Sequence, residues 1–227
     1  MSHHFRLLVF DFDGTLVDSQ RVIVQAMTEA FKADGRPAPD AAEVRRVVGL
    51  TLEVAVARLL PDTEDWSTAV RVADGYRDAF MDLRRDPAYH EPLFPGARET
   101  LTLLDSPEVC LGIATGKGRR GLMDGLERHG LTRYFATLQT ADDGPGKPDP
   151  SMLHRAMDEV GAGPHETVLI GDTTFDMEMA ANAGATAIGV AWGYHDPGDL
   201  TASGAARVIE RFDQLPGELA ALGRTPA

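Results

Sequence analysis

The sequence predicts an α/β fold, in which a parallel sheet is covered by helices on both faces. The first observation is a series of short apolar runs that lack the polar alternation of a half-exposed strand. The expected strands are residues 6–10, 110–115, 135–140, 167–171, 185–190 and 207–210. The second observation is that helical patterns, for example 151–160 and 177–183, lie between these runs. Strands that alternate with helices are typical of a parallel sheet.

The third observation is a long stretch, residues 18–90, without any strand-like run. Segments that contain proline separate its helical patterns, and Pro95-Gly96 marks the return to the alternating pattern. We therefore expect an all-helical domain, residues 17–90, inserted after the first strand of a core formed by 1–16 and 91–227. The expected helices of the insert are 22–32, 41–48, 52–60 and 67–85.

Composition and charge exclude several classes of function. The chain has 227 residues and a net charge of −13, whereas surfaces that bind nucleic acid are usually basic. It has no apolar run near the roughly 20 residues that span a bilayer, and no signal-peptide pattern at its start. We therefore expect a cytoplasmic protein without nucleic-acid or membrane partners; no feature indicates an oligomeric state. The single cysteine, Cys110, lies in an apolar run and is interpreted as structural.

Polar residues follow each of the first four expected strands. Asp11 and Asp13 come directly after the first, and two carboxylates so close repel each other, which favours a bound cation. In an open α/β sheet, ligands bind beyond the carboxyl ends of the strands. The later loops should therefore lie near this pair. They are 115–117, 142–150 and 171–176, and they contain Lys117 and Lys147, two of the three lysines in the chain.

Four segments in these loops resemble, in order, the four motifs of the haloacid dehalogenase superfamily of phosphohydrolases. They are DFDGTLVDS, IATGK, GKPDP and GDTTFD, and together they span most of the chain. The resemblance implies a Rossmann-like core, and the helical insert lies where subfamily I members carry a cap. The segments DGPGKPDP and GVAWGYHDPGDL also resemble the phosphoglycolate phosphatase-like branch.

The resemblance assigns a role to each carboxylate. Asp11 is the expected nucleophile, which would form an aspartyl-phosphate. Asp13 is the expected general acid and base. The implied cofactor is Mg²⁺, with the Asp11 and Asp172 carboxylates and the backbone carbonyl of Asp13 as ligands. Asp176 would support these ligands through water or by holding Lys147.

The remaining candidate residues would bind the substrate, expected to be a small phosphorylated metabolite. The Thr115 hydroxyl, the Gly116 amide and Lys147 would hold the phosphate oxygens. Many relatives have asparagine where this chain has Gly116, so a side-chain contact to substrate is expected to be missing. In the insert, Arg45 and Gly49 are candidates because the corresponding turn of the family faces the active site.

Three functions are compatible with these residues. The favoured one is a Mg²⁺-dependent phosphatase acting on a phosphoglycolate-type phosphate monoester. The alternatives are a sugar phosphomutase of the β-phosphoglucomutase type and a non-catalytic metal-binding regulatory protein. Asp13 favours the first two, because an oxygen leaving group needs a proton.

Several polar residues also have a structural interpretation. Asp149, before Pro150, is expected to cap a helix. Thr173 and Asp176 have the spacing of a capping box. Lys117 is interpreted as a solvated or phosphate-proximal residue rather than a catalytic one.

Overall fold

Six strands form one sheet in the computed structural model, which describes residues 5–86 and 89–223. The strand order is β3-β2-β1-β4-β5-β6 and every neighbouring pair is parallel. The prediction of a parallel α/β fold is confirmed, and each strand lies within one residue of its expected range. The bounds are β1 (Leu7–Phe10), β2 (Cys110–Ala114), β3 (Phe135–Gln139), β4 (Thr167–Gly171), β5 (Thr186–Val190) and β6 (Arg207–Ile209).

Helices cover both faces of the sheet because β1 is apolar on both sides. Successive side chains of a strand point to opposite faces, so Leu8 and Phe10 enter one apolar cluster while Leu7 and Val9 enter another. All four side chains are buried. The helices are α5 (Ala97–Leu104), α6 (Arg119–Arg128) and α10 (Leu215–Leu222) on the first face, and α7 (Ser151–Val160), α8 (Thr174–Asn182) and α9 (Pro197–Ala202) on the second.

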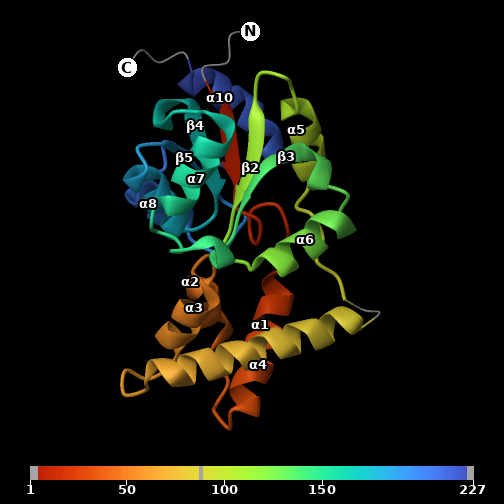
Figure 1. Cartoon of the computed structure of the whole chain (residues 1–227), viewed down its shortest axis with the longest axis vertical. Coiled ribbons are helices and arrows are strands. Elements are labelled where there is room, and N and C mark those ends of the chain that lie inside the picture. The colour runs from red at the N-terminus through yellow and green to blue at the C-terminus, as the bar shows by residue number, and fades with distance from the viewer. Residues whose placement is uncertain (1–4, 87–88, 224–227) are drawn as a thin grey trace.

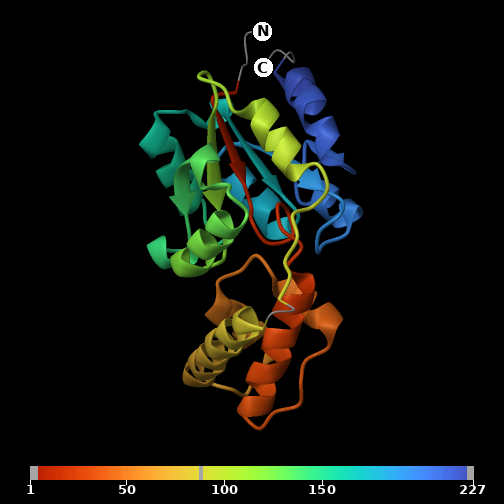
Figure 2. The same cartoon turned by 90° about the vertical axis from the view of Figure 1, so that its right-hand side faces the viewer.

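The segment between β1 and β2 begins with four helices, which lie beyond the carboxyl ends of the strands (Figures 1 and 2). They have an apolar cluster of their own, built on Met27, Phe31, Val56 and Val72. The helical insert expected from the sequence is thus present as a layer beneath the sheet edge. Its helices are α1 (Gln20–Ala33), α2 (Ala41–Val47), α3 (Leu52–Leu59) and α4 (Trp66–Arg85).

Local signals fix where these helices begin. The Asp40 side chain accepts from Ala42 N at 2.6 Å, and Asp65 accepts from Thr68 N at 2.9 Å, so α2 and α4 each start with a satisfied backbone donor. Among residues 5–86 and 89–223, no helix has both the length and the apolar character required to cross a bilayer.

Candidate active site

The sheet order brings three predicted residues to one edge. Because β1 lies between β2 and β4, Asp11 has Thr115 on one side and Asp172 on the other. Backbone hydrogen bonds extend the ladder past the strand ends, from Asp11 N to Ile170 O at 2.9 Å and from Thr115 N to Gln139 O at 3.0 Å. These bonds hold the backbone of Asp11 and Thr115 in the sheet. The side chains of Asp11, Thr115 and Asp172 are all buried.

Lys147 links two of the carboxylates. Its ammonium lies 2.7 Å from Asp11 Oδ2 and 2.7 Å from Asp176 Oδ1, and its side chain is fully buried. Burial alone would lower the pKa of Lys147, but the charges of Asp11 and Asp176 outweigh it and raise that pKa. Lys147 is therefore a fixed positive charge beside Asp11.

Asp172 is held by donors from two other segments. Its Oδ1 accepts from Thr15 Oγ1 at 2.7 Å, and its Oδ2 accepts from the Tyr194 backbone N at 2.9 Å. Gly14 turns the chain here with a φ of 84°, and a Cβ at that position would lie 2.3 Å from Asp172 Oδ2. Only glycine combines this left-handed conformation with so close an approach.

Asp11, Asp172 and Asp176 fit a hard divalent cation. Each offers an oxygen, and the three oxygens lie within 4.8 Å of one another. Burial raises the pKa of Asp11 to about 7, although Lys147 opposes the shift. Burial and then the charges of Asp11 and Asp176 raise the pKa of Asp172 well above its usual range. A cation would relieve this repulsion, and carboxylate oxygens are the ligands that Mg²⁺ prefers.

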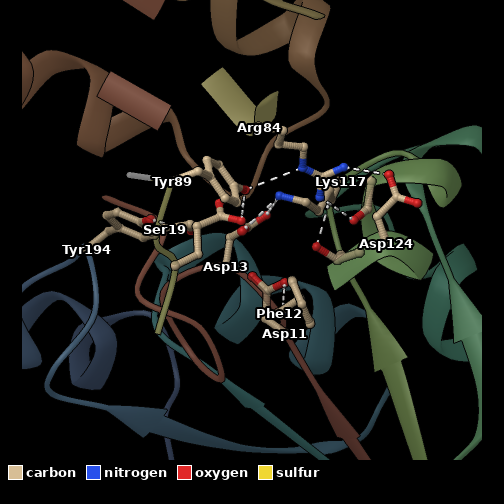
Figure 3. A network of polar contacts seen from close by, with 12 residues as sticks. Asp11, Phe12, Asp13, Ser19, Arg84, Tyr89, Lys117, Asp124 and Tyr194 are labelled. Atoms are coloured by element: carbon tan, nitrogen blue, oxygen red, sulfur yellow. Dashed lines mark hydrogen bonds and ion pairs between the residues drawn. The ribbon is translucent and has the colours of Figure 1, made fainter. Parts of the chain in front are cut away.

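The side chain of Asp13 turns away from this carboxylate cluster and faces Lys117. The Lys117 ammonium lies 3.0 Å from both carboxylate oxygens of Asp13 (Figure 3). Beside it, Arg84 of α4 pairs with Asp124 of α6 at 2.6 Å, which joins the insert to the core. This contact differs from the expectation that Lys117 is solvated or near the phosphate, because its side chain is only 10% exposed and pairs with the predicted acid. The available signal was its rarity as a lysine in a strand-end loop.

The structural interpretation of Thr173 and Asp176 is confirmed, whereas that of Asp149 differs by one residue. Asp149 Oδ1 accepts from Ser151 N at 2.9 Å, but the N-cap of α7 is Pro150 and the helix begins at Ser151. Thr173 and Asp176 form the predicted capping box, with Asp176 Oδ2 accepting from Thr173 N at 3.1 Å. The other oxygen of Asp176 contacts Lys147, so this residue begins a helix and orients the site lysine at the same time.

The turn between α2 and α3 packs on glycines of the core. A Cβ at Gly116 would lie 2.5 Å from Leu50 O, and one at Gly146 would lie 2.3 Å from Thr51 Cγ2. Gly49 itself has a φ of 98° and approaches Thr173. The asparagine that many relatives carry at position 116 would therefore clash with this turn in the arrangement seen here.

Arg45 is the predicted substrate residue that the structure does not bring to the others. A cavity of about 740 Å³ lies between the insert and the sheet edge and is lined by Asp11, Asp13, Gly49, Thr115 and Gly116. Arg45 is not among its lining residues. Its Nη1 lies 3.0 Å from the side-chain amide of Gln20 on α1. Arg45 therefore contacts another helix of the insert.

Comparison with known proteins identifies the family to which the chain belongs. The family model for haloacid dehalogenase-like hydrolases matches residues 8–190. The chain belongs to this family. Probable phosphatase IndB of Dickeya dadantii is 36% identical over 222 residues, which cover 95% of this chain and 94% of that protein. A phosphoglycolate phosphatase of Vibrio parahaemolyticus is 31% identical, covering 92% and 94%.

Solved structures agree with this assignment. The crystal structure of a hydrolase from Pseudomonas syringae has a TM-score of 0.82 and 30% identity, covering 95% of this chain and 98% of that one. The identification of a haloacid dehalogenase-like phosphatase, made from four short motifs, is thereby confirmed.

The loop after β5 packs closely against Asp172, and a substitution in that loop tests whether this packing matters for activity. A Cβ at Gly193 would lie 2.1 Å from Asp172 Cβ, so Gly193→Ala must displace the aspartate or the loop that bonds to it. We expect the variant to lose at least about tenfold in kcat/KM, or about 1.4 kcal/mol of transition-state stabilisation. Phosphate release measures the loss. The control is Gly198→Ala, where a Cβ meets nothing within 4 Å; an equal rate in both variants would contradict the constraint.

Proposed function

We propose that this hydrolase is a Mg²⁺-dependent phosphatase that cleaves the phosphate monoester of a small metabolite through an aspartyl-phosphate at Asp11. The observation that carries the proposal is the contact of buried Asp11 with Lys147 at 2.7 Å, at the wall of the same cavity that Asp13 lines. An anionic nucleophile next to a fixed cation can meet a phosphate dianion. The named relatives make phosphoglycolate the first compound to assay.

The reaction takes place in two steps. Asp11 attacks phosphorus, the bond from phosphorus to the ester oxygen breaks, and the carboxyl group of Asp13 gives its proton to the departing oxygen. Water then attacks the phosphorus of the aspartyl-phosphate while Asp13 takes back a proton. Inorganic phosphate leaves and the Asp11 carboxylate is restored.

Other residues of the chain hold the transferring group. The Thr115 hydroxyl and the Gly116 amide donate to the phosphate oxygens, and Lys147 balances their charge. Lys117, bonded to both oxygens of Asp13, keeps that carboxyl group directed into the cavity.

The proposed metal ligands are the Asp11 and Asp172 carboxylates and the backbone carbonyl of Asp13. Asp176, whose oxygen lies within the same cluster, supports them. When bound, Mg²⁺ supplies the positive charge that offsets the repulsion between the phosphate and these carboxylates.

Metal removal provides a direct check. In excess EDTA, we expect phosphate release to fall to background, and added Mg²⁺ should restore it. The physical reason is that the carboxylate cluster contacts only one protein cation, Lys147, among the described residues. A chelated enzyme that keeps its full rate would contradict the metal requirement.

We also propose that residues 17–90 are a cap domain, with 1–16 and 91–227 as the core. The separate apolar cluster of α1–α4 supports this division. The turn between α2 and α3 contacts Gly116 and Gly146, which supports a cap that packs against the active site. Such a cap excludes bulk water during the reaction.

A further inference from the structure

The cavity above Asp11 and Asp13 is larger than the alcohol part of phosphoglycolate requires. Its volume of about 740 Å³ lies within the range of roughly 300–1,000 Å³ that is typical of sites for drug-sized ligands. The reacting end is lined by Asp11, Asp13 and Thr115, and the opposite wall is formed by helices of the insert. The chemistry of that wall therefore indicates what the enzyme binds beyond the phosphate.

One face of α4 forms an apolar and aromatic part of this wall. Tyr76, Phe80 and Met81 all line the cavity, and the rings of Tyr76 and Phe80 are 5.7 Å apart. The Phe80 ring is close to the reaction centre, because Lys117 Nζ lies 4.8 Å from its centroid and 3.0 Å from the Asp13 carboxylate. A group attached to the ester oxygen next to Asp13 would therefore lie near the Phe80 ring.

Most of the cations that line the cavity are paired with carboxylates. Arg77 pairs with Glu53 and Asp74, Arg84 pairs with Asp124, and Lys117 pairs with Asp13. A carboxylate such as that of glycolate that bound one of these paired cations would displace its partner and leave that partner's charge unpaired.

Two arginines of α6, Arg120 and Arg128, also line the cavity. Arg120 and Arg128 are both exposed, and neither has a carboxylate partner within residues 5–86 and 89–223. Arg128 lies over the Tyr89 ring at 4.8 Å. Because both are exposed, water screens any attraction they offer to an anion.

We propose that the substrate is the phosphate monoester of a neutral alcohol that carries an apolar or aromatic portion larger than glycolate, and that this portion binds against Tyr76, Phe80 and Met81. The inference rests on the proposed function, because it takes the phosphate to lie at Asp11. It selects, among phosphate monoesters, those with an uncharged and partly apolar leaving group.

The test compares three esters of primary alcohols: ethyl phosphate, 2-phenylethyl phosphate and phosphoglycolate. We expect kcat/KM for 2-phenylethyl phosphate to exceed that for each of the others by at least about tenfold, since burying a ring stabilises the complex. Equal values for the phenylethyl and ethyl esters, or a preference for phosphoglycolate, would overturn the inference and leave the proposed function intact. If the folded, Mg²⁺-supplied enzyme released phosphate from none of them, the proposed function would fail as well.

Two variants on α4 locate the contact. Met81→Ala shortens a half-buried side chain of the cavity wall, and we expect it to lower kcat/KM for the phenylethyl ester several-fold more than for the ethyl ester. Leu83→Ala is the matched control, because Leu83 packs in the insert without lining the cavity. It should affect both esters equally. A selective loss in Leu83→Ala, or none in Met81→Ala, would contradict the assigned wall.

Discussion

Asp11→Asn is expected to reduce kcat for phosphate release by at least about 10³-fold, equivalent to about 4 kcal/mol of activation free energy. The amide keeps the size of the carboxylate but is a poor nucleophile, so the covalent step is lost. The Asp11 side chain is buried and lies 2.7 Å from Lys147, which the amide would still contact. Phosphate release in excess Mg²⁺ from ethyl and 4-nitrophenyl phosphate measures the effect.

The control for Asp11→Asn is the same change at another cavity aspartate. Asp142 lines the cavity and accepts from Arg119 N at 2.8 Å, a bond that an asparagine oxygen can also accept. Asp142→Asn should keep most of the activity. If Asp11→Asn retained more than a tenth of the wild-type kcat while staying folded, Asp11 would not be the nucleophile.

Asp13→Asn is expected to act differently on the two half-reactions. With an alkyl phosphate, kcat should fall about 10²–10⁴-fold, because the departing alkoxide receives no proton. With 4-nitrophenyl phosphate, whose leaving group needs none, the first step should persist. The second step should be slow, because water has lost its base.

Rapid mixing of Asp13→Asn with 4-nitrophenyl phosphate tests this directly. We expect a burst of nitrophenolate close to one equivalent of enzyme, followed by slow turnover. Lys117→Met provides a comparison, because it removes the ammonium that contacts Asp13 but leaves the carboxyl group. Its loss of rate should be smaller and without a burst. Equal losses on alkyl and aryl esters in Asp13→Asn, with no burst, would exclude the assigned acid and base role.

The position of the site could be predicted because it depends on local sequence and one topological rule. Continuous apolar runs define the strands, and the carboxyl ends of parallel strands meet at one edge. Asp11, Thr115 and Asp172 follow those ends directly, and the structure brings them together. The start of α8 was predicted at 177 but lies at Thr174. The capping-box spacing of Thr173 and Asp176 already marked the earlier start.

Side-chain contacts between segments far apart in the sequence could not be predicted in the same way. The pairing of Lys117 with Asp13 joins the loop after β2 to the loop after β1, and no spacing within either loop encodes it. The orientation of α2 directs Arg45 to Gln20 and leaves it outside the cavity lining. The need for glycine at positions 116 and 146 arises from the turn between α2 and α3, which packs on them, and the sequence does not reveal that contact.

The account depends most on Asp11 carrying the phosphoryl group. The direct measurement is mass spectrometry of Asp13→Asn that has been mixed with 4-nitrophenyl phosphate and Mg²⁺ and quenched in acid. We predict one phosphate on the peptide that contains Asp11, removed by hydroxylamine and missing from the Asp11→Asn, Asp13→Asn double variant. A phosphate on another residue, or no phosphorylated peptide during active turnover, would contradict the account.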